Sequence, residues 1–263
     1  MKRVTRLLAR MLPVTILDFL GLIRRNQPHE EDFYLFSHFN KSKGLFIDVG
    51  ANCGQSALSL FNVNHSLNVF SLEPNTGMKW LLFLLQVRHP FRFRFLLAGA
   101  GNKEEVITLN IPITRHRDLS TNASFAPDEF DKPYVKDRLK EYAEKNQGKY
   151  SFKTTKAKVI CLDSLNLKPL VIKLDVEGWE LNALKGMEET LKRHRPVLMI
   201  ELNNREAIFP WLKARGYRFY RYTRNPEAFD PIEMHDKCLN AFCLHSDPSA
   251  ELMKHLSPLL PPL

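Results

Sequence analysis

The chain has 263 residues, of which 44% are hydrophobic and 25% charged, close to the average for globular proteins. This composition excludes a disordered tail, a collagen-like chain and a small disulfide scaffold. The net charge is +9, but six basic residues and one acidic residue give residues 1–25 a charge of +5, so the remainder carries only +4. The basic charge therefore belongs largely to one end of the chain, and we expect no nucleic-acid partner.

The four cysteines contain no CxxC pair, and the nine histidines have no metal-ligand spacing. The cysteines are Cys53, Cys161, Cys238 and Cys243. Such spacing fits neither a zinc site nor a redox motif. A disulfide framework is normally denser and occurs in a shorter secreted chain. We therefore predict reduced cysteines, a cytoplasmic protein, and no resident metal ion bound by these residues.

Residues 1–40 are predicted to form a basic amphipathic helical segment. Apolar residues recur there at helical spacing, namely Val4, Leu7, Leu8, Met11 and Leu12. Two interpretations stay open for residues 1–25: a helix lying on an anionic membrane surface, peripheral to the bilayer, or a helix packed on the domain. No apolar run reaches the ~18 residues of a membrane-spanning helix.

From residue 44 onward, strand-like and helix-like patterns alternate. Strands are predicted at 45–49, 67–72, 91–97, 105–110, 156–162, 170–174, 197–201, 217–222 and 239–244. Helices are predicted at 56–61, 77–87, 180–192 and 206–215. This alternation predicts a doubly wound α/β sandwich, with a mainly parallel sheet and an antiparallel closing strand. The predicted domain covers residues 41–247, with a lid-like insertion at 112–155 and a tail at 248–263.

The strongest local motif is the turn Phe46-Ile-Asp-Val-Gly-Ala-Asn-Cys-Gly-Gln-Ser56. A buried strand ends near Asp48, and Gly50 and Gly54 flank a tight turn into a helix. Glycine allows positive φ angles and lets a ligand approach the backbone closely. The spacing D-x-G-x-x-x-G matches neither the dinucleotide motif nor a Walker loop. It predicts a different nucleoside ligand, or else a purely structural turn.

A second carboxylate favours the ligand interpretation. Glu73 ends the next predicted strand, 25 residues after Asp48. In open α/β sheets, an acid at this position accepts hydrogen bonds from ribose hydroxyls. A nucleoside cofactor without a pyrophosphate fits the turn best, which points to S-adenosylmethionine. Its cationic sulfonium and amino group also favour an acid such as Asp48 near the turn.

Three more carboxylates follow later strands. Asp175 and Glu177 come after the strand at 170–174, and Glu201 ends the strand at 197–201. Carboxylates gathered at strand ends raise one another's pKa, as active sites often require. For Glu177 and Glu180 an alternative is a helix N-terminal acid that interacts with the helix dipole. We predict Asp175, Glu177 and Glu201 as the catalytic residues.

Phe46–Ser56, Glu73 and the segment Lys173-Leu-Asp-Val-Glu-Gly-Trp-Glu180 together resemble the FkbM family of S-adenosylmethionine-dependent methyltransferases. The resemblance covers roughly residues 44–245 and implies a Rossmann-like class I methyltransferase fold. It implies O-methylation of a hydroxyl group on a sugar or another small-molecule or glycan acceptor. It also implies a cofactor loop and a ribose contact from Glu73, and its Asn122-Ala-Ser124 match suggests a substrate-facing segment. The loop residues are Asp48, Gly50, Ala51, Asn52 and Gly54.

Two mechanisms stay open for this site. Asp175 or Glu177 could act as general base on the acceptor hydroxyl without a metal ion, which is the interpretation we favour. Alternatively, Asp175, Glu201 and Asn203 could hold a magnesium ion. Other open function classes are a nucleic-acid methyltransferase and a non-enzymatic nucleoside-binding module; the glycine spacing disfavours a nicotinamide oxidoreductase.

Overall fold

The computed structural model describes residues 21, 23, 26–41, 43–114, 117–118, 122–145, 148–236 and 238–260. The two interpretations of residues 1–25 therefore concern residues that lie almost entirely outside this range. Among the described residues, no helix is both long enough and apolar enough to cross a membrane.

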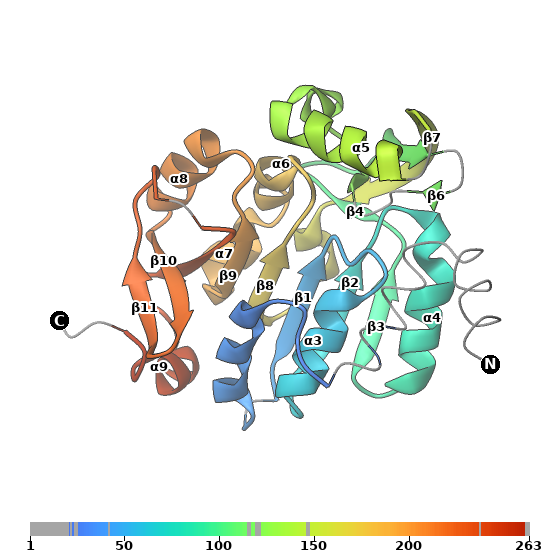
Figure 1. Cartoon of the computed structure of the whole chain (residues 1–263). Coiled ribbons are helices and arrows are strands. Elements are labelled where there is room, and N and C mark those ends of the chain that lie inside the picture. Colours follow the sequence, from blue (N-terminus) through green and yellow to red (C-terminus); the bar gives the residue numbers. More distant parts are fainter. Residues whose placement is uncertain are drawn as a thin grey trace.

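The central element is an eight-stranded sheet with the order β11-β10-β12-β9-β8-β1-β2-β3 (Figure 1). Five neighbouring strands, from β9 to β3, are parallel, and β12, β10 and β11 are antiparallel. The strands are β1 (Leu45–Val49), β2 (Asn68–Leu72), β3 (Phe93–Leu96), β8 (Pro169–Leu174), β9 (Val197–Glu201), β10 (Tyr217–Arg224), β11 (Glu227–Pro231) and β12 (Asn240–His245). The predicted doubly wound, mainly parallel sheet is confirmed.

Helices cover both faces of this sheet because successive side chains of each buried strand point to opposite sides. In β1, Phe46 packs into one core and Ile47 into the other. The first core lies beneath the 3-10 helix η1 (Glu31–Phe39) and helices α3 (Gln55–Val63), α4 (Lys79–Arg88) and α9 (Ala250–Leu256). The second lies beneath α6 (Glu180–Lys185), α7 (Glu188–His194) and α8 (Arg205–Lys213). Short 3-10 helices are η2 (Thr76–Met78), η4 (Pro127–Asp131) and η5 (Leu162–Leu165).

A second sheet, with the order β4-β7-β5-β6, lies beside the first. Its strands are β4 (Gly99–Ala100), β5 (Glu105–Thr114), β6 (Arg117–Asp118) and β7 (Tyr150–Ile160), and α5 (Pro133–Lys145) lies over it (Figure 1). The predicted strands at 105–110 and 156–162 are present, but they pair with each other outside the main sheet. Their antiparallel pairing extends from Glu105 opposite Val159 to Thr114 opposite Tyr150. Both ends of the predicted 112–155 insertion are therefore part of regular strands.

Two predicted segments differ in the structure. The single helix expected at 180–192 is two helices, α6 and α7, separated at Gly186, where an added Cβ would lie 1.8 Å from the Gly101 carbonyl oxygen. The tail expected after residue 247 contains α9, which packs Leu252 and Leu256 into the first core. The Ser249 side chain caps this helix by accepting from the Leu252 N–H at 3.3 Å.

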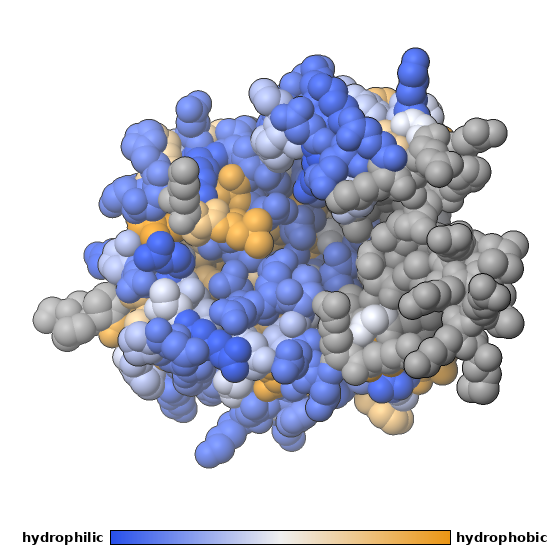
Figure 2. Space-filling model, in the orientation of Figure 1, coloured by the Kyte–Doolittle hydropathy of each residue, from blue (hydrophilic) through white to orange (hydrophobic). Residues whose placement is uncertain are grey.

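The face of the molecule in Figure 2 is mostly hydrophilic where its residues are described, with apolar residues gathered near the antiparallel end of the sheet. Leu239, which precedes β12, is 60% exposed and also lines the main cavity of the candidate site. An exposed apolar side chain therefore contributes to the lining of that cavity.

Candidate functional site

A cavity of about 330 Å³ lies where the carboxyl ends of β1, β2, β8 and β9 meet. β1 has β2 on one side and β8 on the other, so this is the point where strand order reverses and open α/β sheets bind ligands. Among the described lining residues, Arg138 is the only cationic side chain. The lining also contains five carboxylates: Glu30, Glu73, Asp175, Glu177 and Glu201. Carboxyl groups therefore outnumber basic groups in the described lining.

The turn after β1 has the tight geometry that its glycines predict. Gly50, Asn52 and Gly54 all adopt positive φ angles, at 90°, 49° and 91°. A Cβ on Gly50 would lie 1.8 Å from the Asp175 carbonyl oxygen, so only glycine fits between β1 and β8. The Gly50 and Ala51 N–H groups both donate to the Leu72 carbonyl at 3.0 Å. The backbone of the turn is thereby fixed against β2.

The five predicted loop residues take different positions. Gly50 and Asn52 line the cavity, whereas Ala51 and Gly54 form the rear of the turn, where Gly54 packs against Leu85. Asp48 also lies behind the turn and is fully buried. Its Oδ2 accepts from the Ser71 hydroxyl at 3.1 Å, and its Oδ1 has no hydrogen-bond partner among the residues that the structure describes.

Asp48 therefore lies behind the turn rather than on the cavity surface. Burial raises its pKa, against the attraction of Lys173 and the hydrogen bond from Ser71. Its predicted place near the sulfonium of a cofactor stays a prediction, because Asp48 is not among the lining residues.

Glu73 lines the cavity at the end of β2, and backbone N–H groups fix both of its oxygens. Oε2 accepts from the Asn52 N–H at 2.6 Å, and Oε1 accepts from the Asn75 N–H at 2.7 Å. Burial raises the pKa of Glu73 to about 7, although these two hydrogen bonds act in the opposite direction. Each carboxylate oxygen keeps a second lone pair, so Glu73 can accept further hydrogen bonds from a ligand.

The end of β8 carries a buried ion pair. Lys173 is 2% exposed, and its Nζ lies 2.8 Å from Asp175 Oδ2. Burial alone would raise the pKa of Asp175, but the attraction of Lys173 and hydrogen bonds from Glu201 and Lys173 lower it. Asp175 is therefore a permanently ionised carboxylate at neutral pH, paired with a cation supplied by the same strand.

Glu177 follows in a strained turn in which its own φ is 48° and that of Gly178 is 91°. Its carbonyl oxygen accepts from the Ser124 hydroxyl at 2.6 Å, and its carboxylate lies 3.6 Å from the Arg138 guanidinium. Burial, followed by the charge of Asp175, raises the pKa of Glu177 to about 8. Glu177 therefore titrates close to physiological pH.

Glu201, at the end of β9, completes this group. Burial, then the charge of Asp175 and a hydrogen bond with it, raise the pKa of Glu201 to about 10. One oxygen each from Asp175, Glu177 and Glu201 lies within 4.8 Å of the others. The structure thus brings together the three carboxylates that the sequence predicts, with Asp175 ionised at neutral pH and Glu177 and Glu201 mainly protonated.

The domain signature identifies the family. The methyltransferase FkbM domain matches residues 48–219, which is more than half of the chain. The chain belongs to the FkbM methyltransferase family. This is a family of S-adenosylmethionine-dependent enzymes, and the resemblance seen in the sequence is confirmed. None of the curated proteins matches the sequence.

Solved structures show the same fold. The methyltransferase FkbM from Methylobacillus flagellatus KT is 18% identical, with a TM-score of 0.50 over 81% of this chain and 48% of that one. The chain therefore spans about half the length of that protein. Similarity at a TM-score of 0.41 extends to SMU.1697c from Streptococcus mutans in complex with SAH, at 9% identity over 83% and 97% of the two chains. An rRNA methylase from Streptococcus thermophilus has the same score, at 10% identity over 83% and 96%.

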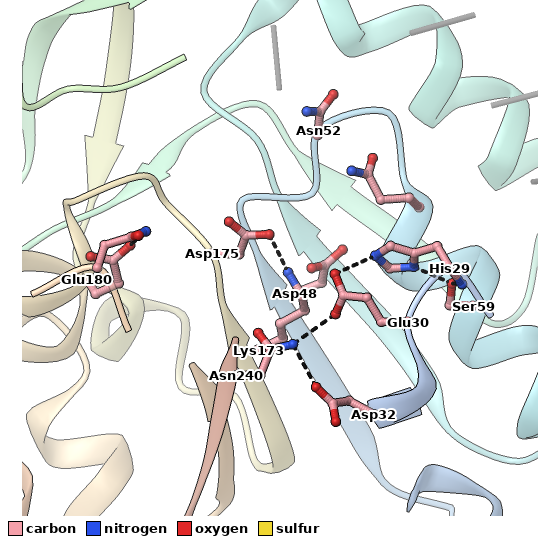
Figure 3. A network of polar contacts seen from close by, with 12 residues as sticks. His29, Glu30, Asp32, Asp48, Asn52, Ser59, Lys173, Asp175, Glu180 and Asn240 are labelled. Carbon is pink, nitrogen blue, oxygen red and sulfur yellow. Dashed lines mark hydrogen bonds and ion pairs between the residues drawn. The ribbon is translucent and has the colours of Figure 1, made fainter. Parts of the chain in front are cut away.

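In this FkbM-family chain, a polar network below the turn was not predicted from the sequence. The Asn240 amide nitrogen donates to Glu30 and to Asp32, both at 2.9 Å, and His29 Nε2 lies 3.2 Å from Glu30 (Figure 3). His29 Nδ1 also lies 2.6 Å from the Ser59 hydroxyl on α3. The network holds the segment before η1 against β12, so that Glu30 reaches the cavity wall.

The opposite wall comes from the second sheet and α5. Asn122 and Arg138 line the cavity there, and Asn122 is 4% exposed. With its amide oxygen toward Arg138, Asn122 accepts from the guanidinium, including Nε at 3.2 Å. The predicted substrate-facing segment at 122–124 thus borders the cavity, whereas Arg138 was not predicted.

Proposed function

We propose that the chain transfers the methyl group of S-adenosylmethionine to a hydroxyl group of a small-molecule or glycan acceptor. The observation that carries this proposal is the meeting, in one cavity, of the glycine turn after β1, the Glu73 carboxylate and the group Asp175, Glu177 and Glu201. Family membership supports methyl transfer, and the acceptor class rests on the resemblance described above.

The residues fit the cofactor in shape and in the hydrogen-bond acceptors that they offer. The turn at Gly50 exposes backbone without a Cβ, and Glu73 offers acceptor oxygens at the position of a ribose contact. The carboxyl groups of the lining also offer hydrogen-bond acceptors to the ammonium group of such a ligand. When bound, S-adenosylmethionine supplies an electrophilic methyl group.

Glu177 is the residue best suited to take the acceptor's proton. A general base works best when its pKa lies near the operating pH, and the pKa of Glu177 is about 8. Asp175 is a weaker base, because its pKa is lowered and its Oδ2 is paired with Lys173. In this mechanism burial and the charge of Asp175 together raise the pKa of Glu177, and Glu201 keeps its proton.

The cavity disfavours a nucleic acid as the acceptor. A phosphate backbone requires cations, and Arg138 alone provides one among the described lining residues. A non-enzymatic nucleoside-binding module would leave the three converging carboxylates without a role. Identifying the methylated product, or finding that none forms, distinguishes both alternatives from the proposed activity.

Magnesium assistance is the second mechanism to be tested. Three carboxylate oxygens within 4.8 Å of one another suit a hard cation. However, the Lys173 ammonium already neutralises Asp175, and Arg138 lies beside Glu177. We therefore propose metal-free transfer, with the chain's own cations balancing the carboxylates.

The test incubates purified protein and S-adenosylmethionine with a host metabolite extract and searches by mass spectrometry for products that gain one CH₂ group. Activity should persist in EDTA. Abolition by EDTA with restoration by magnesium would replace the base mechanism by the metal mechanism. Cofactor binding without any methylated product, across hydroxyl acceptors and RNA, would instead indicate a binding module.

Glu73→Ala should lower the affinity for S-adenosylmethionine at least about tenfold, because a hydrogen bond to a charged acceptor contributes ~1.5–3 kcal/mol. The substitution also removes the carboxylate oxygen to which the Asn52 N–H donates its hydrogen bond. Isothermal titration calorimetry measures the affinity, and the exposed Glu104→Ala provides the matched control. Equal affinity in the Glu73 variant would remove this residue from the cofactor site.

A further inference from the structure

Helix α4 is apolar on both of its faces, although only one of them packs on the sheet. Leu81, Leu82 and Leu85 are buried in the first core. The outer face carries large apolar side chains that are 44–91% exposed: Trp80, Phe83, Leu84, Val87 and, just beyond the helix, Phe91. A surface helix normally has a polar outer face, so this contiguous patch indicates a contact surface.

Basic residues border the outer face of α4. Lys79, Arg88 and Arg94 are exposed, and within the described part of the chain none of them forms an ion pair. No acidic residue occurs in the sequence between Glu73 and Glu104. The patch therefore combines exposed aromatic and aliphatic side chains with uncompensated positive charge.

We propose that the outer face of α4, together with Phe91, binds an anionic lipid surface. Aromatic rings and leucines enter the region between headgroups and acyl chains, while lysines and arginines contact the anionic headgroups. The Trp80 and Phe83 rings contact each other edge-on at 6.1 Å and present one apolar surface. α4 lies beside β3, the strand at one edge of the main sheet (Figure 1).

Charge favours this occupant over the alternatives. The N-terminal segment carries +5 over residues 1–25, so packing it on α4 would place like charges together. A second copy of the chain would oppose two basic patches in the same way. An RNA would neutralise the arginines but leave five large apolar side chains without a partner. An anionic bilayer provides a partner for the exposed apolar side chains and for the basic residues.

The test uses the full chain in flotation with vesicles of phosphatidylcholine alone or mixed with equal phosphatidylglycerol. Wild type should float with the mixed vesicles, and salt should weaken the binding. The double variant Phe83→Glu/Leu84→Glu should lower the bound fraction at least about tenfold, because it removes apolar contacts and adds charge repulsion. Val106→Glu on β5, 64% exposed in wild type, is the matched control and should bind as wild type does.

Trp80→Phe gives an independent readout. It keeps the apolar contact, so vesicle binding should persist, whereas tryptophan quenching by brominated lipids should fall sharply. Circular dichroism checks the fold of each variant. If the double variant is misfolded, Phe91→Glu, outside the helix, serves in its place.

Several results would overturn the proposal. These are no binding by wild type, undiminished binding by the Phe83→Glu/Leu84→Glu variant or by Phe91→Glu, and loss of binding only when residues 1–20 are removed. Vesicle binding that appears only after removal of residues 1–20 would show that this segment covers the patch instead. A dimer that the α4 substitutions dissociate, or an RNA that binds through α4 while vesicles do not, would assign the patch to that partner.

Discussion

A chain carrying Glu177→Gln is expected to methylate its acceptor about 10²–10⁴-fold more slowly than wild type while binding S-adenosylmethionine equally well. The amide keeps the size of the side chain but cannot accept the hydroxyl proton. Single-turnover kinetics measures the rate and calorimetry the affinity. In wild type, kcat/KM should rise with pH and level off above about 8, because the base acts only when deprotonated. In the Glu177→Gln variant, kcat/KM should not rise with pH in this range.

Glu201→Gln is the matched control for this expectation. The pKa of Glu201 is about 10, so the residue is protonated at neutral pH and an amide imitates it closely. Its rate should stay within about tenfold of wild type, below the range for loss of a general base. Equal damage from both substitutions would favour metal coordination, in which each carboxylate acts as a ligand. Full activity in the Glu177 variant would show that another group takes the proton.

Lys173→Met should destabilise the protein by ~3–5 kcal/mol, because removing one partner of a buried ion pair leaves the other charge without compensation. Two carboxylates depend on this ammonium: Asp175, at 2.8 Å, and Asp48, whose raised pKa would rise further. Chemical denaturation with urea measures the free energy of unfolding. The denatured state should appear at correspondingly lower urea concentrations.

The chain offers an exposed counterpart with the same sequence spacing. Lys103 and Glu105 are also two residues apart, with Nζ 3.1 Å from Oε2, but Lys103 is 67% exposed. Lys103→Met should cost less than about 1 kcal/mol, as is typical of surface ion pairs. Similar decreases in the free energy of unfolding of the two variants would show that burial does not increase the contribution of the Lys173–Asp175 pair to stability.

Local sequence patterns predicted the parts of the fold that depend on local chemistry. The apolar runs of β1, β8 and β9 and the glycines at 50 and 54 follow from the needs of a buried strand and a tight turn. The convergence of Asp175, Glu177 and Glu201 followed from one topological rule, that carboxyl ends of parallel strands share an edge. These predictions required no knowledge of long-range contacts.

The remaining features depend on residues that are distant in the sequence. Asn240 contacts Glu30 across 210 residues, and no local pattern encodes that pair. β5 and β7 have ordinary strand patterns, but their separation into a second sheet depends on pairing with each other. Lys173 appeared as one polar residue in an apolar strand; only the structure shows that it balances Asp175 from within the core.

The two walls of the cavity come from different layers of the molecule. The main sheet carries the turn, Glu73 and the three carboxylates, whereas α5 contributes Arg138 and the segment between β6 and η4 contributes Asn122. Under the proposed function, we expect changes in the segment between β5 and β7 to alter which acceptor binds without moving these carboxylates. Under the proposed function, acceptor selectivity can therefore change through one layer of the molecule while the carboxylates held by the other layer stay the same.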